Sequence, residues 1–250
     1  MRIRYASDLH VELSGHLPRQ IPEIGEDLVV LAGDIGEGTN GITWAAETFA
    51  GRPVLYVLGN HELYGHDFHR LVEQARDAAA ATDNVQLLEN DVAWFGDLRV
   101  LGCTLWTDFD AHGARTRAMD EARHAMHDYR VIRVGDRPLE PGDVLDRCRK
   151  SRAWLEDQLR ASDAPTLVVT HMAPSARDEL VNPFFGSQDP LTPAFANAFD
   201  HLIASPVVAW IFGHHHYSLN TTIDGVRIVS NQRGYPGEGC DFAWDRVLEL

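Results

Sequence analysis

Seven residues of metal-binding type stand just after short apolar segments, and this placement is the most informative feature of the sequence. The segments are rich in Val, Ile and Leu and cover residues 3–6, 28–32, 54–58, 167–170 and 207–212. The residues that follow them are Asp8, His10, Asp34, Asn60, His171, His214 and His216. Imidazole mixed with carboxylate suits Mn, Fe, Zn, Co or Ni better than Ca or Mg alone. Seven ligands are too many for one tetrahedral ion, and they are about right for two ions that share a carboxylate.

The five apolar segments are typical of buried strands. In open α/β sheets, ligands bind in the crevice outside the carboxyl ends of the strands, which is where the seven residues would lie. Alternate residues of an extended chain point to the same side, so Asp8 and His10 would grip one ion together, and so would His214 and His216. A glycine stands directly before three of the ligands, which permits a tight turn and a close backbone approach at those strand ends.

The remaining sequence predicts helices and a second group of strands. Helices are expected over 39–49, 66–81 and 144–160, and from Thr192-Pro193 onward with Phe195, Phe199 and Leu202 on one face. An antiparallel group of strands is expected over 85–88, 92–95 and 99–103. A hairpin around Asp224-Gly225 is expected from the strands 220–223 and 226–229. We therefore expect an α/β protein with parallel and antiparallel strands. It would form a single domain over 1–250, with an insertion at one edge around 110–140.

Composition narrows the classes of function. The chain has 250 residues, of which 44% are hydrophobic, and its formal net charge of −15 disfavours non-specific binding to nucleic acid. No segment resembles a secretory signal, and the longest apolar run is far too short to span a bilayer. The three cysteines are widely scattered, so no disulfide framework is expected. These features predict a cytoplasmic protein without a membrane segment, and they leave the oligomeric state open.

Five sequence elements, taken together, resemble the calcineurin-like metallophosphoesterase superfamily. Asp-x-His at 8–10, Gly-Asp at 33–34, Gly-Asn-His-Glu at 59–62, the lone His171 and Gly-His-x-His at 213–216 follow one another in the order of that family. The resemblance implies two packed mixed β-sheets flanked by helices, a four-layer αββα sandwich, with the C-terminal hairpin in the second sheet. It also implies that Asp8, His10 and His216 hold one ion, that Asn60, His171 and His214 hold the other, and that Asp34 bridges them.

The same resemblance implies a binuclear metal-dependent phosphoesterase that hydrolyses a phosphate mono- or diester by attack of a metal-bridging hydroxide. The cofactor would be two divalent transition-metal ions, with Mn the first choice and Fe, Zn, Co or Ni as alternatives. His61 would be catalytic and would protonate the departing oxygen. A small phosphate ester is the expected substrate, and a nuclease is less expected, because the sequence has no obvious basic stripe.

Three residues are candidates for binding the substrate or supporting catalysis. Glu37 could orient His61 or could serve only as a surface or capping residue. Arg130 and Arg233 could each grip a phosphate bidentately or could each form a structural salt bridge. The segment Glu37-Gly38-Thr39 lacks the arginine of the protein-phosphatase branch, so a Ser/Thr protein phosphatase is not expected. Tyr64 and Phe184-Phe185 could line the pocket, although packing in the core is the expectation.

Two other classes of function compete with the hydrolase. Some members of this fold have lost catalysis and act as binding modules, but such members usually have broken motifs, and all the motifs are intact here. A binuclear amidohydrolase barrel would need eight βα units, which the antiparallel strands do not allow.

Overall fold

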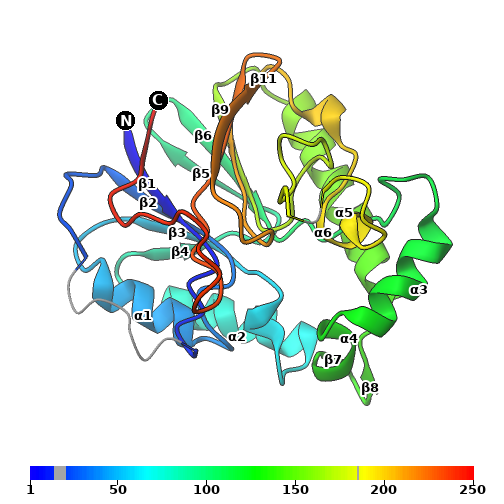
Figure 1. The fold of residues 1–250 in the computed structure, drawn as a ribbon. Coiled ribbons are helices and arrows are strands. Elements are labelled where there is room, and N and C mark those ends of the chain that lie inside the picture. The colour runs from blue at the N-terminus through cyan, green and yellow to red at the C-terminus, as the bar shows by residue number, and fades with distance from the viewer. Residues whose placement is uncertain (14–20, 185) are drawn as a thin grey trace.

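The computed structural model describes residues 1–13, 21–184 and 186–250, and its centre is a pair of mixed β-sheets (Figure 1). The first sheet has the strand order β13-β1-β2-β3-β4. Its strands are β1 (Arg2–Ala6), β2 (Leu28–Ala32), β3 (Val54–Val57), β4 (Val85–Leu87) and β13 (Val247–Glu249). β1 to β4 are parallel to one another, and β13 pairs antiparallel with β1, which brings the two chain ends together (Figure 1).

The second sheet has the order β11-β12-β10-β9-β6-β5. Its strands are β5 (Asp91–Phe95), β6 (Leu98–Cys103), β9 (Thr166–Thr170), β10 (Val207–Ile211), β11 (Leu219–Ile223) and β12 (Val226–Ser230). The four central strands are parallel, and the edge strands β5 and β11 are antiparallel to their neighbours. The predicted C-terminal hairpin is β11-β12, and it belongs to this second sheet as expected.

Both faces of each sheet are covered, which is why the central strands β2, β3 and β10 are apolar at every position. Ile3, Val30 and Leu55 of the first sheet pack against Leu167 and Ile211 of the second, in the core between the sheets. The outer face of the first sheet is covered by α1 (Asn40–Thr48) and α2 (Phe68–Ala80), and the outer face of the second by α3 (Arg115–Ala125) and α5 (Pro141–Arg160). The result is the four-layer αββα sandwich, which confirms the predicted fold class.

One strand lies in a different sheet from the one expected. Residues 85–88 were expected in the antiparallel group, but β4 pairs parallel with β3, with Val54 opposite Val85. The reason is the helix α2, which lies between these two strands in the sequence. A strand, a crossover helix and a second strand form a parallel unit, because only a crossover of that length returns the chain to the same end of the sheet.

The expected helix after Thr192-Pro193 is also much shorter than predicted. α6 (Thr192–Phe195) ends after four residues, and Phe199 and Leu202 belong instead to a separate turn around the 3₁₀ helix η2 (Asp200–Leu202). The chain becomes extended after Phe195 because Asn197 is fully buried and donates its side-chain amide to the Trp106 carbonyl at 2.8 Å. A buried polar group must find such partners, and here they override the helical pattern of apolar residues.

The segment around 110–140 contains α3, α4 (Asp128–Val131) and a small hairpin of β7 (Arg133–Val134) and β8 (Arg137–Pro138). α3 packs against α5, and the backbone of Gly65 donates to the carbonyl of Val131 at 3.3 Å, so the segment reaches from one outer layer to the strand ends of the other. Figure 1 shows it at one side of the molecule, next to the 3₁₀ helix η1 (His61–Leu63) and α2.

In the part of the chain that the structure describes, no helix is long and apolar enough to cross a bilayer.

Candidate metal centre

All seven predicted ligands meet at one place, at the carboxyl ends of the parallel strands of both sheets. Those from the first sheet follow β1, β2 and β3, and those from the second follow β9 and β10. The seven are buried, with the exception of the half-buried His216. Three sets of side chains bring their ligand atoms within 4.8 Å of one another: Asp8–His10–His216, Asp34–His171–His214 and His10–Asp34–His61.

The backbone at five of the seven residues is left-handed and not extended. The φ angles are 53° at Asp8, 47° at His10, 55° at Asp34, 71° at His214 and 49° at His216. Asp8 and His10 do share one ligand set, but the reason given for this, alternation along an extended chain, was wrong. The expectation that His214 and His216 grip one ion together was wrong, because the two belong to different ligand sets. Residues with side chains rarely adopt this conformation, and where they do, the strain commonly marks a functional site.

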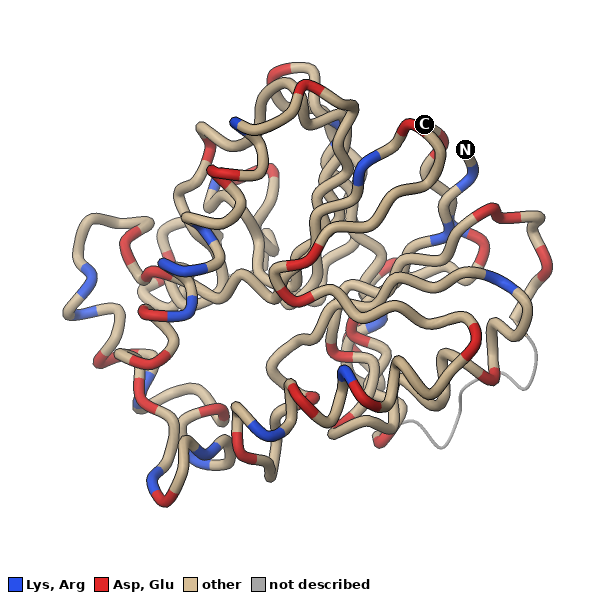
Figure 2. The backbone as a smooth tube through the Cα atoms, turned by 180° about the vertical axis from the view of Figure 1, so that it is seen from behind, with Lys and Arg blue, Asp and Glu red and all other residues tan. Residues whose placement is uncertain are grey.

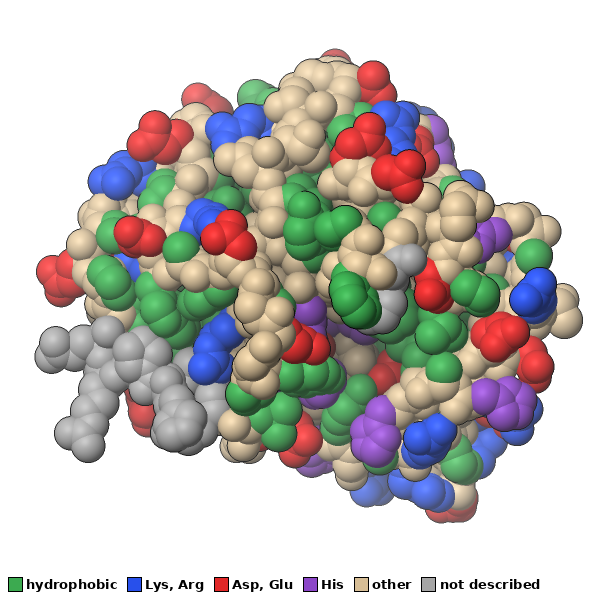
Figure 3. Space-filling view, in the orientation of Figure 1, with side chains coloured by type: hydrophobic (Ala, Val, Ile, Leu, Met, Phe, Trp, Pro, Cys, Tyr) green, Lys and Arg blue, Asp and Glu red, His purple; other side chains and the backbone are tan. Residues whose placement is uncertain are grey.

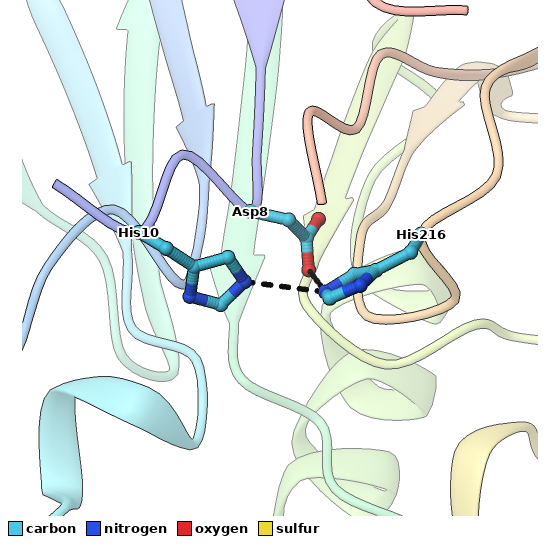
Figure 4. Close-up of side chains that lie close together, drawn as sticks. All are labelled: Asp8, His10 and His216. Carbon is cyan, nitrogen blue, oxygen red and sulfur yellow. Dashed lines mark hydrogen bonds and ion pairs between the residues drawn. The ribbon is translucent and has the colours of Figure 1, made fainter. Parts of the chain in front are cut away.

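The first set joins the loop after β1 to the loop after β10. Figure 4 shows Asp8, His10 and His216 pointing toward one another. Nε2 of His216 lies 3.2 Å from Nε2 of His10 and 3.5 Å from Oδ1 of Asp8. On its other side, the His216 ring contacts Oε2 of Glu238 through Nδ1 at 2.6 Å. Burial alone would lower the pKa of His216, but the Asp8 and Glu238 carboxylates raise it to about 9. Negative charge is thus concentrated here and favours a cation.

The second set lies between the sheets. His171 donates from Nδ1 to the Ala32 carbonyl at 2.8 Å, so that Nε2 faces Oδ2 of Asp34 at 3.4 Å and Oδ1 of Asn60 at 3.1 Å. Burial would lower the pKa of His171, yet Asp34 raises it to about 10. The Nε2 atom of His214 is buried and has no hydrogen-bond partner among the described residues.

These two sets fit divalent transition metals. A buried imidazole nitrogen without a partner is costly unless a proton donor or a cation meets it, and His214 offers such a nitrogen beside a carboxylate. The donors are nitrogen and oxygen atoms of imidazole, carboxylate and amide groups, with no thiolate among them. Asp34 is common to two of the sets, as a residue shared by two ions would be.

His61 lies beside the same centre, close to one hydroxyl and two carboxylates that could orient it. Its Nε2 is 2.9 Å from the hydroxyl of Tyr235 and 4.0 Å from Oδ2 of Asp34, and its Nδ1 is 3.7 Å from Oε1 of Glu12. The ring of Tyr64 lies against it, with 4.1 Å between centroids. Burial would lower the pKa of His61, and the Asp34 and Glu12 carboxylates raise it above its usual value.

The acid that faces His61 is therefore Glu12, whereas the sequence pointed to Glu37. The backbone carbonyl of Glu37 accepts from the amide of Asn40 at 3.3 Å. Arg130 donates to the His124 carbonyl at 2.6 Å, and Arg233 donates to the Leu9 carbonyl at 2.9 Å. In the ranges 1–13, 21–184 and 186–250, none of the three lines the pocket above the metal centre.

That pocket has a volume of about 640 Å³, and aromatic side chains form much of its wall. Figure 3 shows histidines at the bottom of a hollow that hydrophobic side chains surround. The aromatic residues are Tyr64, Phe184, Phe195, Tyr217 and Tyr235. Core packing was expected for both Tyr64 and Phe184. It was wrong for Phe184, which is 87% exposed, whereas the half-buried Tyr64 packs against the core and also lines the pocket. Phe185 lies outside the described residues.

Glu62 ties the loops of the first sheet together beneath the site. Its fully buried carboxylate accepts from the backbone amides of Asp34, Ile35 and Gly59 at 3.1, 2.9 and 2.8 Å, and from the hydroxyl of Tyr56 at 2.7 Å. Three backbone donors hold the loops after β2 and β3 in one fixed arrangement. The glutamate of the Gly-Asn-His-Glu element thus supports the loop that carries Asp34.

The glycines next to the ligands are required by close approach, as the sequence predicted. A Cβ on Gly33 would meet the ring of His171, one on Gly59 would meet the Asp34 carboxylate, and one on Gly213 would meet Oδ2 of Asp8. Each glycine therefore makes room for a ligand from another segment.

Replacing Gly59 with alanine is expected to displace Asp34 and to lower kcat/KM by about 10²-fold, since a shift of about 1 Å in a catalytic group has that effect. Steady-state kinetics under saturating metal measures it. The matched control is Gly142→Ala, because a Cβ there meets nothing within 4 Å. If the two variants retain equal activity, the close packing of Gly59 on Asp34 does not contribute to catalysis.

The fold and the five motifs are those of a phosphoesterase. The family model of the calcineurin-like phosphoesterases matches residues 1–218, and the chain belongs to this family. It is an enzyme that hydrolyses phosphate esters, and its family uses divalent metal ions.

The chain is also similar to curated proteins and, in its fold, to solved structures. The chain is 26% identical to an uncharacterized protein of Acanthamoeba polyphaga mimivirus, over 97% of this chain and 94% of the viral protein. It is also 26% identical to the [acyl-carrier-protein] phosphodiesterase PptH of Mycobacterium tuberculosis, over 93% of this chain and 77% of that protein. The crystal structure of that phosphopantetheinyl hydrolase superposes with a TM-score of 0.76 at 21% identity, covering 98% of this chain and 95% of the other. A dimetal phosphatase from Danio rerio gives a TM-score of 0.50 at 18% identity, over 93% and 87% of the two chains.

Proposed function

We propose that this protein is a binuclear metal-dependent phosphoesterase. The observation that carries the proposal is the position of Asp34, whose carboxylate belongs to one ligand set with His171 and His214 and to another with His10 and His61. One ion would be held by Asp8, His10 and His216. The other would be held by Asn60, His171 and His214, and Asp34 would bind both ions. Manganese is our first choice, and Fe, Zn, Co or Ni would also suit these donors. When bound, the two ions would supply Lewis-acid stabilisation of the phosphate oxygens and a water-derived nucleophile at neutral pH.

In this proposal, the chain's own contribution to the reaction is proton transfer by His61. Its ring lies at the edge of the pocket and the Tyr235 hydroxyl marks the direction of Nε2. Glu12 at Nδ1 would hold the ring so that Nε2 points at the departing oxygen. A positioned general acid of this kind is worth about 10²–10⁴-fold in rate.

The pocket favours a substrate with little negative charge. Its wall contains the carboxylates of Asp34, Asp128, Glu238 and Asp241, and no lysine or arginine from the described residues. The second charge of a phosphate monoester would therefore meet four carboxylates and no lysine or arginine of the described residues. Acidic and basic residues are interspersed over the whole backbone, as Figure 2 shows, which does not suit a polyanion such as nucleic acid. We accordingly propose a small phosphodiester with an uncharged arm that lies on the aromatic wall. The relative PptH is named a phosphodiesterase, which agrees with this choice.

A matched pair of chromogenic esters tests the proposal. The protein is dialysed free of metal and loaded with Mn²⁺, and kcat/KM is measured for bis(p-nitrophenyl) phosphate and for p-nitrophenyl phosphate. We expect hydrolysis that requires metal and a preference for the diester of at least about tenfold, equal to ~1.4 kcal/mol. A preference for the monoester would contradict the proposed substrate class. Failure to hydrolyse any phosphate ester with any of the five metals would favour a non-catalytic binding module of the same fold.

A further inference from the structure

Asp128 connects the 110–140 segment to the metal centre. It is the first residue of α4, its side chain is buried with 2% of the residue exposed, and it lies 68 positions along the chain from Asn60. One of its oxygens, Oδ1, accepts two hydrogen bonds, one from Nδ2 of Asn60 at 3.0 Å and one from the hydroxyl of Tyr64 at 2.8 Å. Burying a carboxylate is costly, and these two donors offset part of that cost.

Asp128 and Tyr64 fix which end of the Asn60 amide faces the ligand set. Nδ2 donates to Asp128 and also lies 3.2 Å from the Tyr64 hydroxyl, so the amide nitrogen points away from the centre. Oδ1 then faces Nε2 of His171 at 3.1 Å. Only the oxygen of an amide has lone pairs to offer a cation, because its nitrogen carries two protons and donates. Without the Asp128 carboxylate, Nδ2 would lose its charged acceptor and the preference for this orientation would be weaker.

We propose that Asp128 is a positioning residue that keeps Oδ1 of Asn60 directed at the second metal ion. The inference rests on the proposed function and extends it, since it gives the 110–140 segment a role in metal binding. Groups behind metal ligands typically change metal affinity by 10- to 100-fold when they are removed. Asp128 acts on a neutral amide in the same way that other carboxylates orient ligating imidazoles.

The test compares Asp128→Leu with Asp128→Asn. Leucine has a similar volume and no acceptor, whereas asparagine keeps an oxygen that can accept from Asn60 and Tyr64. We expect the affinity for the second Mn²⁺, measured by isothermal titration calorimetry, to fall by about 10- to 100-fold in Asp128→Leu and to stay within about threefold of the wild type in Asp128→Asn. The matched control is Asp120→Leu in α3, where the carboxylate is 74% exposed and should leave both affinities unchanged.

Circular dichroism of the metal-free variants shows whether the fold is kept. If Asp128→Leu does not fold, Tyr64→Phe provides a second test. This variant keeps the ring against His61 and removes the hydroxyl that contacts Asp128 and Asn60. Its affinity for the second ion should fall, by less than tenfold. The inference is overturned if a folded Asp128→Leu binds both ions with wild-type affinity. If leucine is not tolerated, the same result in Tyr64→Phe overturns it. Either result leaves the phosphoesterase proposal intact. If the wild-type protein itself binds no second ion, the proposed function fails, and the inference fails with it.

Discussion

Replacing Asp34 with alanine should remove nearly all phosphoesterase activity. Its carboxylate takes part in two of the three ligand sets, so its loss weakens the binding of both ions at once. Metal ions contribute several kcal/mol to stabilising the charge of such a reaction, and each ~1.4 kcal/mol is a factor of ten in rate, so kcat/KM should fall by at least about 10³-fold. Steady-state hydrolysis of the diester under saturating Mn²⁺ measures this loss.

The control for this variant is Asp136→Ala, which removes an exposed carboxylate from the turn between β7 and β8 and should have wild-type activity. Thermal unfolding of both metal-free variants separates a loss of function from a loss of fold. If Asp34→Ala kept more than about a tenth of the wild-type kcat/KM, less than ~1.4 kcal/mol would depend on the shared carboxylate and the two-ion account would be wrong.

Replacing His61 with alanine is expected to lower kcat by about 10²–10⁴-fold while both metal ions remain bound. The loss should depend on the leaving group. An alkoxide needs a proton as it departs, whereas p-nitrophenolate is stable without one. The fall in kcat should therefore be much larger for a dialkyl phosphodiester, which can release only an alkoxide, than for bis(p-nitrophenyl) phosphate.

His124→Ala is the matched control, because that imidazole is 76% exposed on α3 and should be dispensable. Metal analysis distinguishes the role of proton donor from that of ligand, since His61 also belongs to a ligand set with His10 and Asp34. An equal loss with every leaving group, accompanied by the loss of one ion, would show that His61 is a ligand and not the acid.

The ligands could be predicted from the sequence because they depend on features that are local to each segment. A run such as Leu28–Ala32 reveals a buried strand, and the Asp34 that follows it must lie at a carboxyl end. Parallel pairing then brings those ends together, and both sheets contribute to the same edge. The type of fold and the convergence of all seven candidate ligands follow from this logic, together with the family resemblance.

The residues that support the ligands could not be predicted in the same way. Glu238 reaches His216 and Asp128 reaches Asn60 through contacts between distant segments, and neither residue stands in a periodic pattern. Glu12 had a local signal, because it lies two residues beyond His10, but it belongs to no motif. Glu37 was considered for the role beside His61 by analogy with a different branch of the family, with a surface or capping role as the equal alternative.

The backbone at the site was also beyond prediction. Asp8, His10 and Asp34 have left-handed conformations that disfavour residues with side chains, and neither propensity nor alternation predicts such angles. They persist because the surrounding contacts hold them, for example the amide of His214 on Oδ1 of Asp8 at 3.0 Å. The strain is thus a property of the assembled site, and the sequence of each loop alone does not contain it.

The number of metal ions bound per chain tests the central claim most directly. The purified protein is stripped of metal, equilibrated with Mn²⁺ by dialysis and analysed for metal and protein in the same sample, next to Asp34→Ala. Two ions per wild-type chain, falling to fewer than one in the variant, is the expected result. A wild-type chain that binds one ion or none under saturating Mn²⁺, Fe²⁺, Zn²⁺, Co²⁺ and Ni²⁺ would contradict the proposed binuclear centre.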